Sequence, residues 1–286
     1  MWFRTLAQEL DEKRSAMSRE LSDLADRVTT RFLIELGVAG GGVLERSAGL
    51  TSVLGGSPIA YNSAVVVPRL DDENADAAIA AISARLDELH APGSWHLDAG
   101  STPADLADRL LAAGYVDGGA DASMALPIDS RGSVPPLPEG ADIHEVDTAR
   151  DDGGATLQDW IDVLSDGFGE GRPEAEWAGE VYRRLAAGPS SHHRLLVATQ
   201  GGAPVSAASL LIDEDAVGIF FVGTRPSARR KGLGAAITHC AIRLGAEAGC
   251  RAAVLGASPM GRPVYARLGF VDCGSTRILE RAAPTS

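Results

Sequence analysis

One stretch of the sequence, VGIFFVGTRPSARRKGLGAA from Val217 to Ala236, runs from an apolar strand through a loop into the start of a helix. A helix N-terminus carries partial positive charge and leaves about four N–H groups unpaired. Glycines there let the backbone approach an anion closely, and basic side chains add full positive charge. The residues of these kinds are Arg229, Arg230, Lys231, Gly232 and Gly234. The stretch predicts a diphosphate site, although a glycine turn beside a solvated basic face would have the same composition.

Two motifs exclude the common nucleotide-binding loops and indicate another family. The stretch lacks the GKS/T of a Walker loop, and residues 235–237 break the GxGxxG of a dinucleotide fold. Residues 229–234 instead fit R-x-x-G-x-G/A after V-x-T-x-P, which resembles the pyrophosphate motif of the GNAT superfamily of acyl-CoA N-acyltransferases. A second segment, PVYARLGF at residues 263–270, resembles the short helix of that superfamily. The resemblance covers about residues 141–286 and implies an α/β (α+β) fold, a GNAT-like mixed central sheet flanked by helices.

The resemblance also implies how acetyl-CoA, the expected co-substrate, would bind. Its thioester would lie in a V-shaped gap between two strands, one ending near Val222 and the other near Gly256. The first strand would pair with the pantetheine arm, and a backbone N–H near Val222 would polarise the thioester carbonyl. The expected cofactor-binding residues are Val222, Thr224, Arg229, Arg230, Lys231, Gly232, Leu233, Gly234 and Ala235. An amine would attack the thioester directly, and no metal is expected.

Tyr265 is the candidate catalytic residue, because it stands four residues before the Gly-Phe pair of the second motif. A phenol with an ordinary pKa near 10 is protonated at neutral pH, so it can donate a proton to a leaving thiolate. The alternative is a core tyrosine whose hydroxyl bonds to the backbone.

The general base has no clear candidate in the sequence. The strand GIFFV at residues 218–222 carries no carboxylate, although many relatives place a Glu on this strand. An alkylammonium has a pKa near 10.4 and must lose a proton before it attacks. The candidates considered are Glu170, Glu176, His192, His193, Asp213, Glu214 and Asp215. Asp213, Glu214 and Asp215 lie at a turn, where a solvated face explains them better, and none of the other four is favoured, so the base stays unassigned.

The chain divides at one proline-rich connector, SVPPLP, because tandem prolines continue neither a helix nor a central strand. Four ranges follow: an N-terminal helical segment at 1–40, a degenerate GNAT-like domain at 41–128, a linker at 129–140 and a GNAT acetyltransferase domain at 141–286. In the last range we expect a strand near 143–146, helices near 154–168 and 173–187, strands near 193–199, 204–212 and 216–222, a helix at 232–248, a strand at 252–256, a short helix at 262–268 and a closing strand or two from 270 to 281. Trp160, Trp177 and Tyr182 are expected in the helical core.

The two halves of the chain resemble each other at an offset of 155 residues. The offset superposes Val67 on Val222, Ile82 on Ile237, Leu89 on Leu244, Gly114 on Gly269 and Tyr115 on Phe270. We interpret this as a duplication, with chance matching of apolar positions as the alternative. Residues 74–79 then stand opposite residues 229–234 without glycine or basic side chains, beside an acidic helix start. The first copy is therefore expected not to bind coenzyme A, as in tandem GNAT enzymes with one working half.

Composition narrows the class of partner. The formal net charge of −13 argues against nucleic acid or an anionic membrane, and no apolar run reaches the length of a membrane span. The three cysteines fit neither a disulfide framework nor a zinc site, which favours a cytoplasmic protein. Residues 5–36 carry a helical apolar stripe, which packs on its own domain or, as an alternative, forms a homodimer. The stripe consists of Leu6, Leu10, Met17, Leu21, Leu24 and Val28.

The leading hypothesis is an N-acetyltransferase that moves an acetyl group from acetyl-CoA to a primary amine of a small molecule or peptide. A non-catalytic acyl-CoA sensor is the alternative, and the missing strand carboxylate favours it. Another acyl group or an O-linked acceptor is a third hypothesis, since the thioester site dictates neither.

Overall fold

The computed structural model describes residues 2–55, 57–131, 135–148, 156–167, 171–185 and 192–284, with the backbone alone for 2–15. The first half contains α1 (Trp2–Ala39), β1 (Val43–Ser47), β2 (Leu50–Leu54), β3 (Ala64–Val66), α2 (Asp72–Leu89), β4 (Gly93–Leu97), α3 (Leu106–Ala112) and β5 (Val116–Pro127). The second half contains β6 (Ala141–Glu145), α4 (Leu157–Gly167), α5 (Arg172–Leu185), β7 (His193–Gln200), β8 (Ala203–Ile212), β9 (Ala216–Thr224), α6 (Leu233–Glu247), β10 (Ala252–Ala257), α7 (Arg262–Leu268) and β11 (Val271–Arg281). Short 3₁₀ turns lie at Ala60–Asn62, Ile128–Ser130 and Pro226–Ala228.

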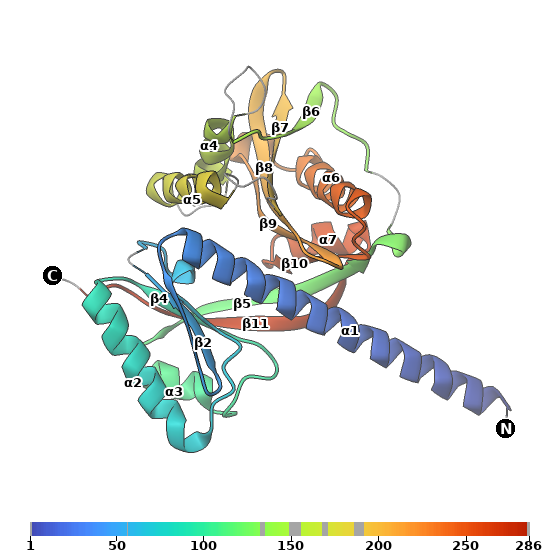
Figure 1. Ribbon diagram of the computed structural model, residues 1–286. Coiled ribbons are helices and arrows are strands. Elements are labelled where there is room, and N and C mark those ends of the chain that lie inside the picture. Colours follow the sequence, from blue (N-terminus) through green and yellow to red (C-terminus); the bar gives the residue numbers. More distant parts are fainter. Residues whose placement is uncertain are drawn as a thin grey trace.

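The strands form one mixed sheet in which the two halves exchange their last strands. Its order is β1-β2-β3-β4-β11-β5-β10-β9-β8-β7-β6, so β11 lies beside β4, and β5 lies beside β10 (Figure 1). The order of elements along the chain follows the predicted ranges 41–128 and 141–286. Each half of the sheet, however, is completed by a strand of the other half.

The exchange creates a pseudo-twofold axis between β5 and β11. These strands are antiparallel, and Thr276 pairs with Asp121, its counterpart at the offset of 155 residues. Outward from this point, β4 matches β10, β3 matches β9 and β2 matches β8 in both order and strand direction. The predicted duplicated mixed sheet with flanking helices is therefore confirmed.

The two halves also repeat the turn that follows their short helices. Gly114 and Gly269 both have left-handed φ values, +90° and +99°. In each turn the next aromatic residue donates its backbone N–H to a carbonyl five residues back, Tyr115 to Leu110 and Phe270 to Tyr265, both at 3.1 Å. Glycine adopts this φ without steric cost, which explains why the Gly-aromatic pair stands out in both halves.

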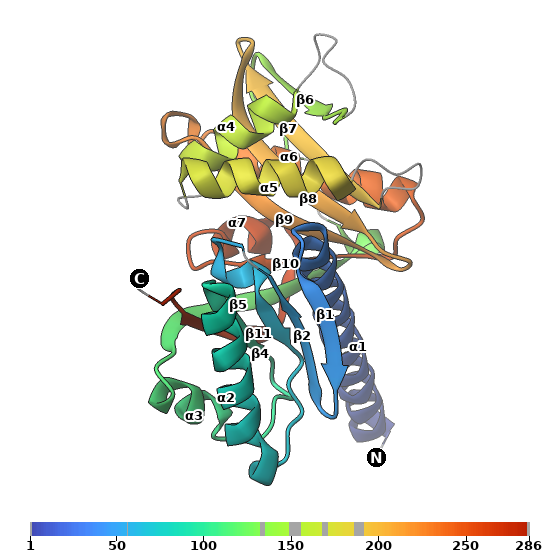
Figure 2. The same ribbon diagram turned by 60° about the vertical axis from the view of Figure 1, so that its left-hand side comes forward.

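Helices cover both faces of the sheet in three apolar clusters. Helices α1, α4 and α5 share one cluster, α6 and α7 lie in a second, and α2 and α3 cover the first half in a third (Figures 1 and 2). Every element expected in the second half is present, and a single strand closes it. Trp160 and Tyr182 are fully buried and Trp177 is partly buried against the same cluster, as expected for helical core residues.

The long helix α1 crosses both halves. Leu21, Leu24 and Val28 of its predicted apolar stripe are buried, but Met17 is 52% exposed. The reason is that the N-terminal turns of α1 project beyond the sheet, so position 17 has little to pack against (Figure 1). Within the described residues, no helix combines the length and apolar composition that crossing a membrane would require.

Candidate functional site

A gap opens between β9 and β10 at the position expected for acyl-CoA. The two parallel strands pair over only three positions and stop at Gly218 and Val254. Strand β9 continues to Thr224 and β10 continues to Ala257 without further pairing between them. The backbone of β9 beyond Gly218 thus presents an edge inside the sheet, where an extended chain can add as a strand.

A β-bulge in β9 shapes this edge. The β8–β9 register shifts between Ala207 and Ser209, so Phe221 and Val222 stand opposite Ala208 alone. Phe221 has φ +50°, a left-handed conformation that is costly for a bulky residue. The indole Nε1 of Trp160 donates a 3.1 Å hydrogen bond to the Ala208 carbonyl, so this carbonyl stays paired inside the core.

Aromatic side chains hold Phe221 in that conformation. Its ring lies 5.8 Å from Phe32, 5.9 Å from Tyr61, 6.1 Å from Trp160 and 6.3 Å from Tyr182, measured between centroids. These partners come from α1, the turn after β2, α4 and α5. The bulge is therefore held by both halves of the molecule, because packing around one strained residue offsets the cost of its φ angle.

The loop after β9 leads into an open helix N-terminus. Arg230 and Gly232 both have left-handed φ values, +64° and +88°, and Gly232 is the N-cap of α6 without a side-chain cap. Ala236 makes the first helical bond, to the Gly232 carbonyl at 3.0 Å. The N–H groups of the preceding turn have no partner within the helix, which is the arrangement that binds phosphate.

The predicted cofactor-binding residues lie together at this loop, but their side chains differ in role. Arg229 donates to the carbonyls of Thr224, at 3.0 Å, and of Gly167, at 3.1 Å, so its guanidinium fastens the loop to the end of α4. Thr224 bonds through its hydroxyl to Ser206. Arg230, Lys231 and Gly232 are exposed, Leu233 is buried, and Val222, Gly234 and Ala235 are partly buried. The assignment of acyl-CoA contacts to these residues stays a prediction.

A cavity of about 360 Å³ adjoins the gap and contains Tyr265. Val222 and Gly256 line it from the two separating strands, and Thr29 and Phe32 line it from α1. Burial, together with the charge of Asp121, raises the pKa of Tyr265 to about 12, so its hydroxyl is protonated at neutral pH. Within the described residues this hydroxyl has no hydrogen-bond partner, unlike that of a tyrosine whose role is to tie down the backbone.

Asp121 is a carboxylate beside the gap that sequence reasoning missed. It lies on β5, and its Oδ2 is 3.7 Å from the position that a Cβ on Gly256 would occupy. Burial raises the pKa of Asp121. No motif in the sequence singles out Asp121 from the other acidic residues of the first half. Nothing near it indicates that β5 enters the second half of the sheet.

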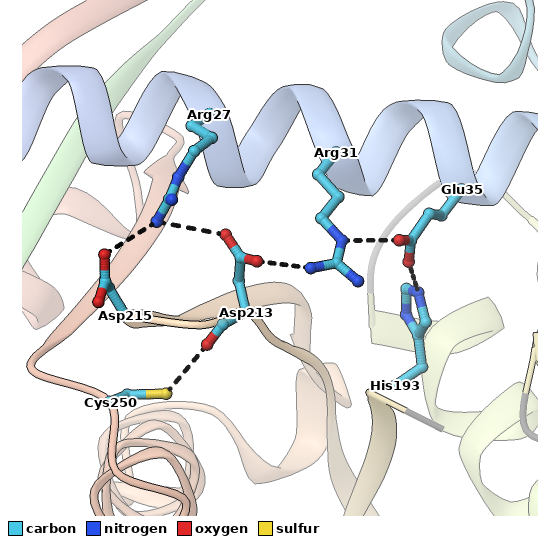
Figure 3. A network of polar contacts seen from close by, with 7 residues as sticks. All are labelled: Arg27, Arg31, Glu35, His193, Asp213, Asp215 and Cys250. Atoms are coloured by element: carbon cyan, nitrogen blue, oxygen red, sulfur yellow. Dashed lines mark hydrogen bonds and ion pairs between the residues drawn. The ribbon is translucent and has the colours of Figure 1, made fainter. Parts of the chain in front are cut away.

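The described base candidates lie away from the cavity. The two most buried of them, Asp213 and His193, pair with side chains of α1 (Figure 3). Asp213 accepts a 2.5 Å hydrogen bond from Arg31 and pairs with Arg27 at 3.4 Å. His193 bonds through Nε2 to Glu35 Oε2 at 2.6 Å. Cys250 donates its thiol to the Asp213 carbonyl at 3.5 Å.

The remaining described candidates also lie away from the cavity. Asp215 pairs with Arg27, and Glu176 pairs with Arg172 on α5. His192 and Glu214 are exposed, and Glu170 lies outside the described residues. None of the described candidates lines the cavity beside Tyr265. The described residues also contain no group of three His, Cys, Asp or Glu side chains arranged to hold a metal ion.

The first half repeats the left-handed residue at the end of the strand but not the phosphate loop. Val67 has φ +44° at the end of β3, as Phe221 has in β9. Helix α2 begins at Asp72, five residues after Val67, whereas α6 begins at Leu233, twelve residues after Phe221. The comparison of residues 74–79 with 229–234 is therefore wrong in register, because 74–79 lie inside α2 and the loop itself is missing.

The gap is also closed in the first half. Beyond the β3–β4 ladder, Thr102 donates its N–H to the Pro68 carbonyl and accepts from the Leu70 N–H, both at 3.2 Å. An Arg69–Asp98 ion pair at 2.7 Å lies across the same place. The chain itself thus fills the edge that stays open beside β9.

Comparison with known proteins identifies the class of this domain. Residues 173–281 match the family model described as an acetyltransferase (GNAT) domain. Residues 173–281 therefore form a GNAT acetyltransferase domain, and the predicted resemblance is confirmed. No curated protein matches the sequence.

Solved structures share the fold over most of the chain. A GCN5-related N-acetyltransferase from Kribbella flavida superposes with a TM-score of 0.67 at 20% identity, covering 92% of this chain and 96% of that one. A GCN5-related N-acetyltransferase from Sphaerobacter thermophilus gives 0.61 at 16% identity, with 83% and 78% covered. A tandem GNAT protein from the clavulanic acid biosynthesis pathway gives 0.50 at 16% identity, with 84% and 82% covered.

Proposed function

We propose that this protein is an N-acetyltransferase that transfers the acetyl group of acetyl-CoA directly to a primary amine. The observation that carries the proposal is the cavity where the open edge of β9, the Tyr265 hydroxyl and the Asp121 carboxylate meet. The GNAT acetyltransferase domain at residues 173–281 supports acyl transfer as the reaction class.

The chain's own groups fit acetyl-CoA at three points. The unpaired edge of β9 beyond Gly218 would bond the pantetheine arm as an added strand. The N–H groups at the start of α6 would bind the diphosphate, with Arg230 and Lys231 exposed beside them. The bulge at Phe221 and Val222 would turn a backbone N–H towards the thioester carbonyl.

Tyr265 and Asp121 would carry the two proton transfers. Asp121 would accept a proton from the ammonium of the acceptor, after which the amine nitrogen forms a bond to the acyl carbon and the carbon–sulfur bond breaks. Tyr265 would donate its proton to the departing thiolate. The acylated nitrogen then loses its second proton, which restores the proton of Tyr265, and the proton held by Asp121 returns to solvent. An ammonium and a thioester thus yield an amide, a free thiol and one released proton.

Only the second half would bind acetyl-CoA. The short connection from Val67 to Asp72 supports this, because it leaves no loop for a diphosphate. The hydrogen bonds of Thr102 across the equivalent gap support it too, since a pantetheine arm would have to displace them. The first half would instead contribute Asp121 and part of the acceptor cavity.

The acceptor we propose is an amine of a small molecule or peptide, and the reaction is proposed to take place in the cytoplasm. Three free cysteines are compatible with a reducing compartment. The alternative of a silent acyl-CoA sensor rested on the lack of a carboxylate on β9, and Asp121 now provides a carboxylate from another strand.

The direct test is release of free thiol from acetyl-CoA in the presence of a panel of primary amines. Amine-dependent thiol release with formation of the matching amide is expected. Binding of acetyl-CoA by calorimetry without thiol release for any amine in the panel would favour the sensor.

A further inference from the structure

The titratable side chains on the floor of the cavity are of one kind. The floor is formed by β4, β11 and β5, which present His96, Glu280 and Asp121 to the same space. Within the described residues, neither carboxylate has a hydrogen bond or an ion pair with a cationic side chain. All titratable groups on this floor are therefore hydrogen-bond acceptors or anions, provided that His96 is neutral.

His96 is neutral and presents an acceptor. Burial lowers its pKa to about 4, and its side chain is only 9% exposed. The Ser94 hydroxyl donates its hydrogen to the Ala60 carbonyl at 3.1 Å, so its oxygen must accept the 3.0 Å bond from His96 Nε2. Nδ1 is then the bare nitrogen of the ring, and it has no partner among the described residues.

The carboxylates of Asp121 and Glu280 lie at different distances from the gap between β9 and β10. Asp121 pairs in register with Thr276 and faces Gly256, beside the gap. Glu280 stands four positions further along β11, and its Cδ would be 3.0 Å from a Cβ on Gly118, so its carboxylate lies over that glycine. Three residue steps along β5 separate Gly118 from Asp121, which corresponds to roughly 10 Å at most.

His96 lies between these two levels. It pairs with Ile278, the residue of β11 that falls between Thr276 and Glu280 on the cavity side. His96 therefore lies beyond Asp121, on the β4 side of the floor. A single small ammonium beside Asp121 would leave Glu280 without a ligand.

The walls above this floor are apolar and aromatic. Phe32 of α1 stacks on Phe220 with centroids 3.7 Å apart, and Tyr61 and Leu33 continue the same surface. Methylene groups are favoured against such walls, and aromatic faces also attract ammonium groups. The net charge of −13 further favours the approach of a cation.

We propose that the acceptor is an aliphatic diamine, whose first amino group reacts beside Asp121 while its second ammonium is held by the Glu280 carboxylate. The proposal rests on the acetyl-transfer function given above and specifies its substrate class. A second cationic group on the substrate explains why carboxylates lie at two separate places in one largely apolar cavity. A monoamine of the same length would place its terminal methyl group against the Glu280 carboxylate, which is unfavourable.

The test compares putrescine, cadaverine and hexamethylenediamine, each with the n-alkylamine of the same chain length, as acceptors in the thiol-release assay. For at least one chain length we expect kcat/KM to be about tenfold or more higher for the diamine, which corresponds to one favourable charge contact. In Glu280→Gln the ratio of diamine to monoamine should fall to about one.

Glu214→Gln is the matched control, because Glu214 is exposed and does not line the cavity, and the substitution removes the same charge. This variant should keep the wild-type ratio. Equal rates for diamines and monoamines in the wild type, or equal loss of the ratio in both variants, would overturn the diamine proposal and leave acetyl transfer intact. If no amine reacts, calorimetry with hexamethylenediamine decides: binding that is lost in Glu280→Gln but kept in Glu214→Gln supports the diamine site, and the absence of binding removes it.

Discussion

The indole Nε1 of Trp160 donates a hydrogen bond of 3.1 Å to the carbonyl oxygen of Ala208, at the point where β9 bulges away from β8. The same indole ring lies edge-on to Phe221, the residue whose φ of +50° makes the bulge. Helix α4 therefore supports the strand that lines the proposed thioester site, both by pairing the carbonyl that the bulge frees and by packing on the strained residue.

Trp160→Phe should lower both stability and kcat/KM. We expect it to destabilise the protein by about 1 kcal/mol or more beyond the loss from packing, because the Ala208 carbonyl loses its buried partner. Trp95→Phe is the matched control, since Trp95 is equally buried but its Nε1 has no partner among the described residues. Urea unfolding and kcat/KM measured on both variants would check this, and equal losses in the two would contradict the role of the bond.

Tyr265→Phe should lower kcat by about 100-fold while the KM for acetyl-CoA changes by less than about twofold, because the hydroxyl acts on the leaving thiolate and not in binding. Tyr115→Phe is the control: its ring follows the equivalent short helix, but its hydroxyl bonds to Ser83 in the first half. Steady-state kinetics on both variants would check the prediction. Unchanged kcat in Tyr265→Phe would remove this residue from the mechanism.

Asp121→Asn should lower kcat by about 100-fold and remove a pH dependence. The base must be ionised, so the wild-type kcat should rise with pH through the pKa of Asp121, which burial places above its ordinary value of 3.8. The variant should lack this acid limb. Asp117→Asn on the same strand removes an exposed partner of Arg277 and should keep the limb. A limb that persists in Asp121→Asn would assign it to another group.

The sequence predicts those parts of the site whose residues lie close together along the chain. The phosphate loop lies within one continuous stretch of strand, loop and helix, and Tyr265 lies within the second motif, PVYARLGF, so both could be proposed from local spacing. Asp121 could not be found in this way, because its place depends on the exchange of β5 and β11 between halves, which no local pattern encodes.

The general base could not be assigned from the sequence for a related reason. Asp213 follows β8 and His193 begins β7, so both lie close in sequence to the strands of the proposed site. In the fold, however, Asp213 pairs with Arg31 and His193 pairs with Glu35, both from α1. The sequence predicts α1 as a helix from its apolar stripe, yet the stripe does not say which half it packs against. Contacts between segments separated by 158 or 182 positions depend on the folded topology alone.

Gly232→Ala should weaken acetyl-CoA binding by about tenfold, since a Cβ at the N-cap disturbs the N–H groups expected to hold the diphosphate. Gly249→Ala, at the other end of α6, is the control. Both glycines have left-handed φ values, +88° and +91°, so each substitution should cost about 1 kcal/mol in stability. Calorimetry should give one acetyl-CoA site per wild-type chain, weakened only in Gly232→Ala. Two sites would contradict the closed gap in the first half.

Glu35→Gln should destabilise the protein by about 2 kcal/mol at neutral pH, because it weakens a partly buried charged contact between α1 and the second half. Burial raises the pKa of Glu35, but the hydrogen bonds from His193 and Arg31 outweigh burial and lower this pKa to about 2. A folded-state pKa below the ordinary value of 4.5 means that the contribution is fully present above that pH and is lost as the pH falls towards about 2.

The difference in unfolding free energy between wild type and Glu35→Gln should therefore shrink as the pH is lowered from about 4.5 towards 2, as measured by urea unfolding at each pH. Glu88→Gln, which removes an exposed partner of Arg85 on α2, is the control and should cost less than about 0.5 kcal/mol at every pH. A constant difference between wild type and Glu35→Gln across this range would mean that packing, and not the charge of Glu35, fastens α1 to the second half.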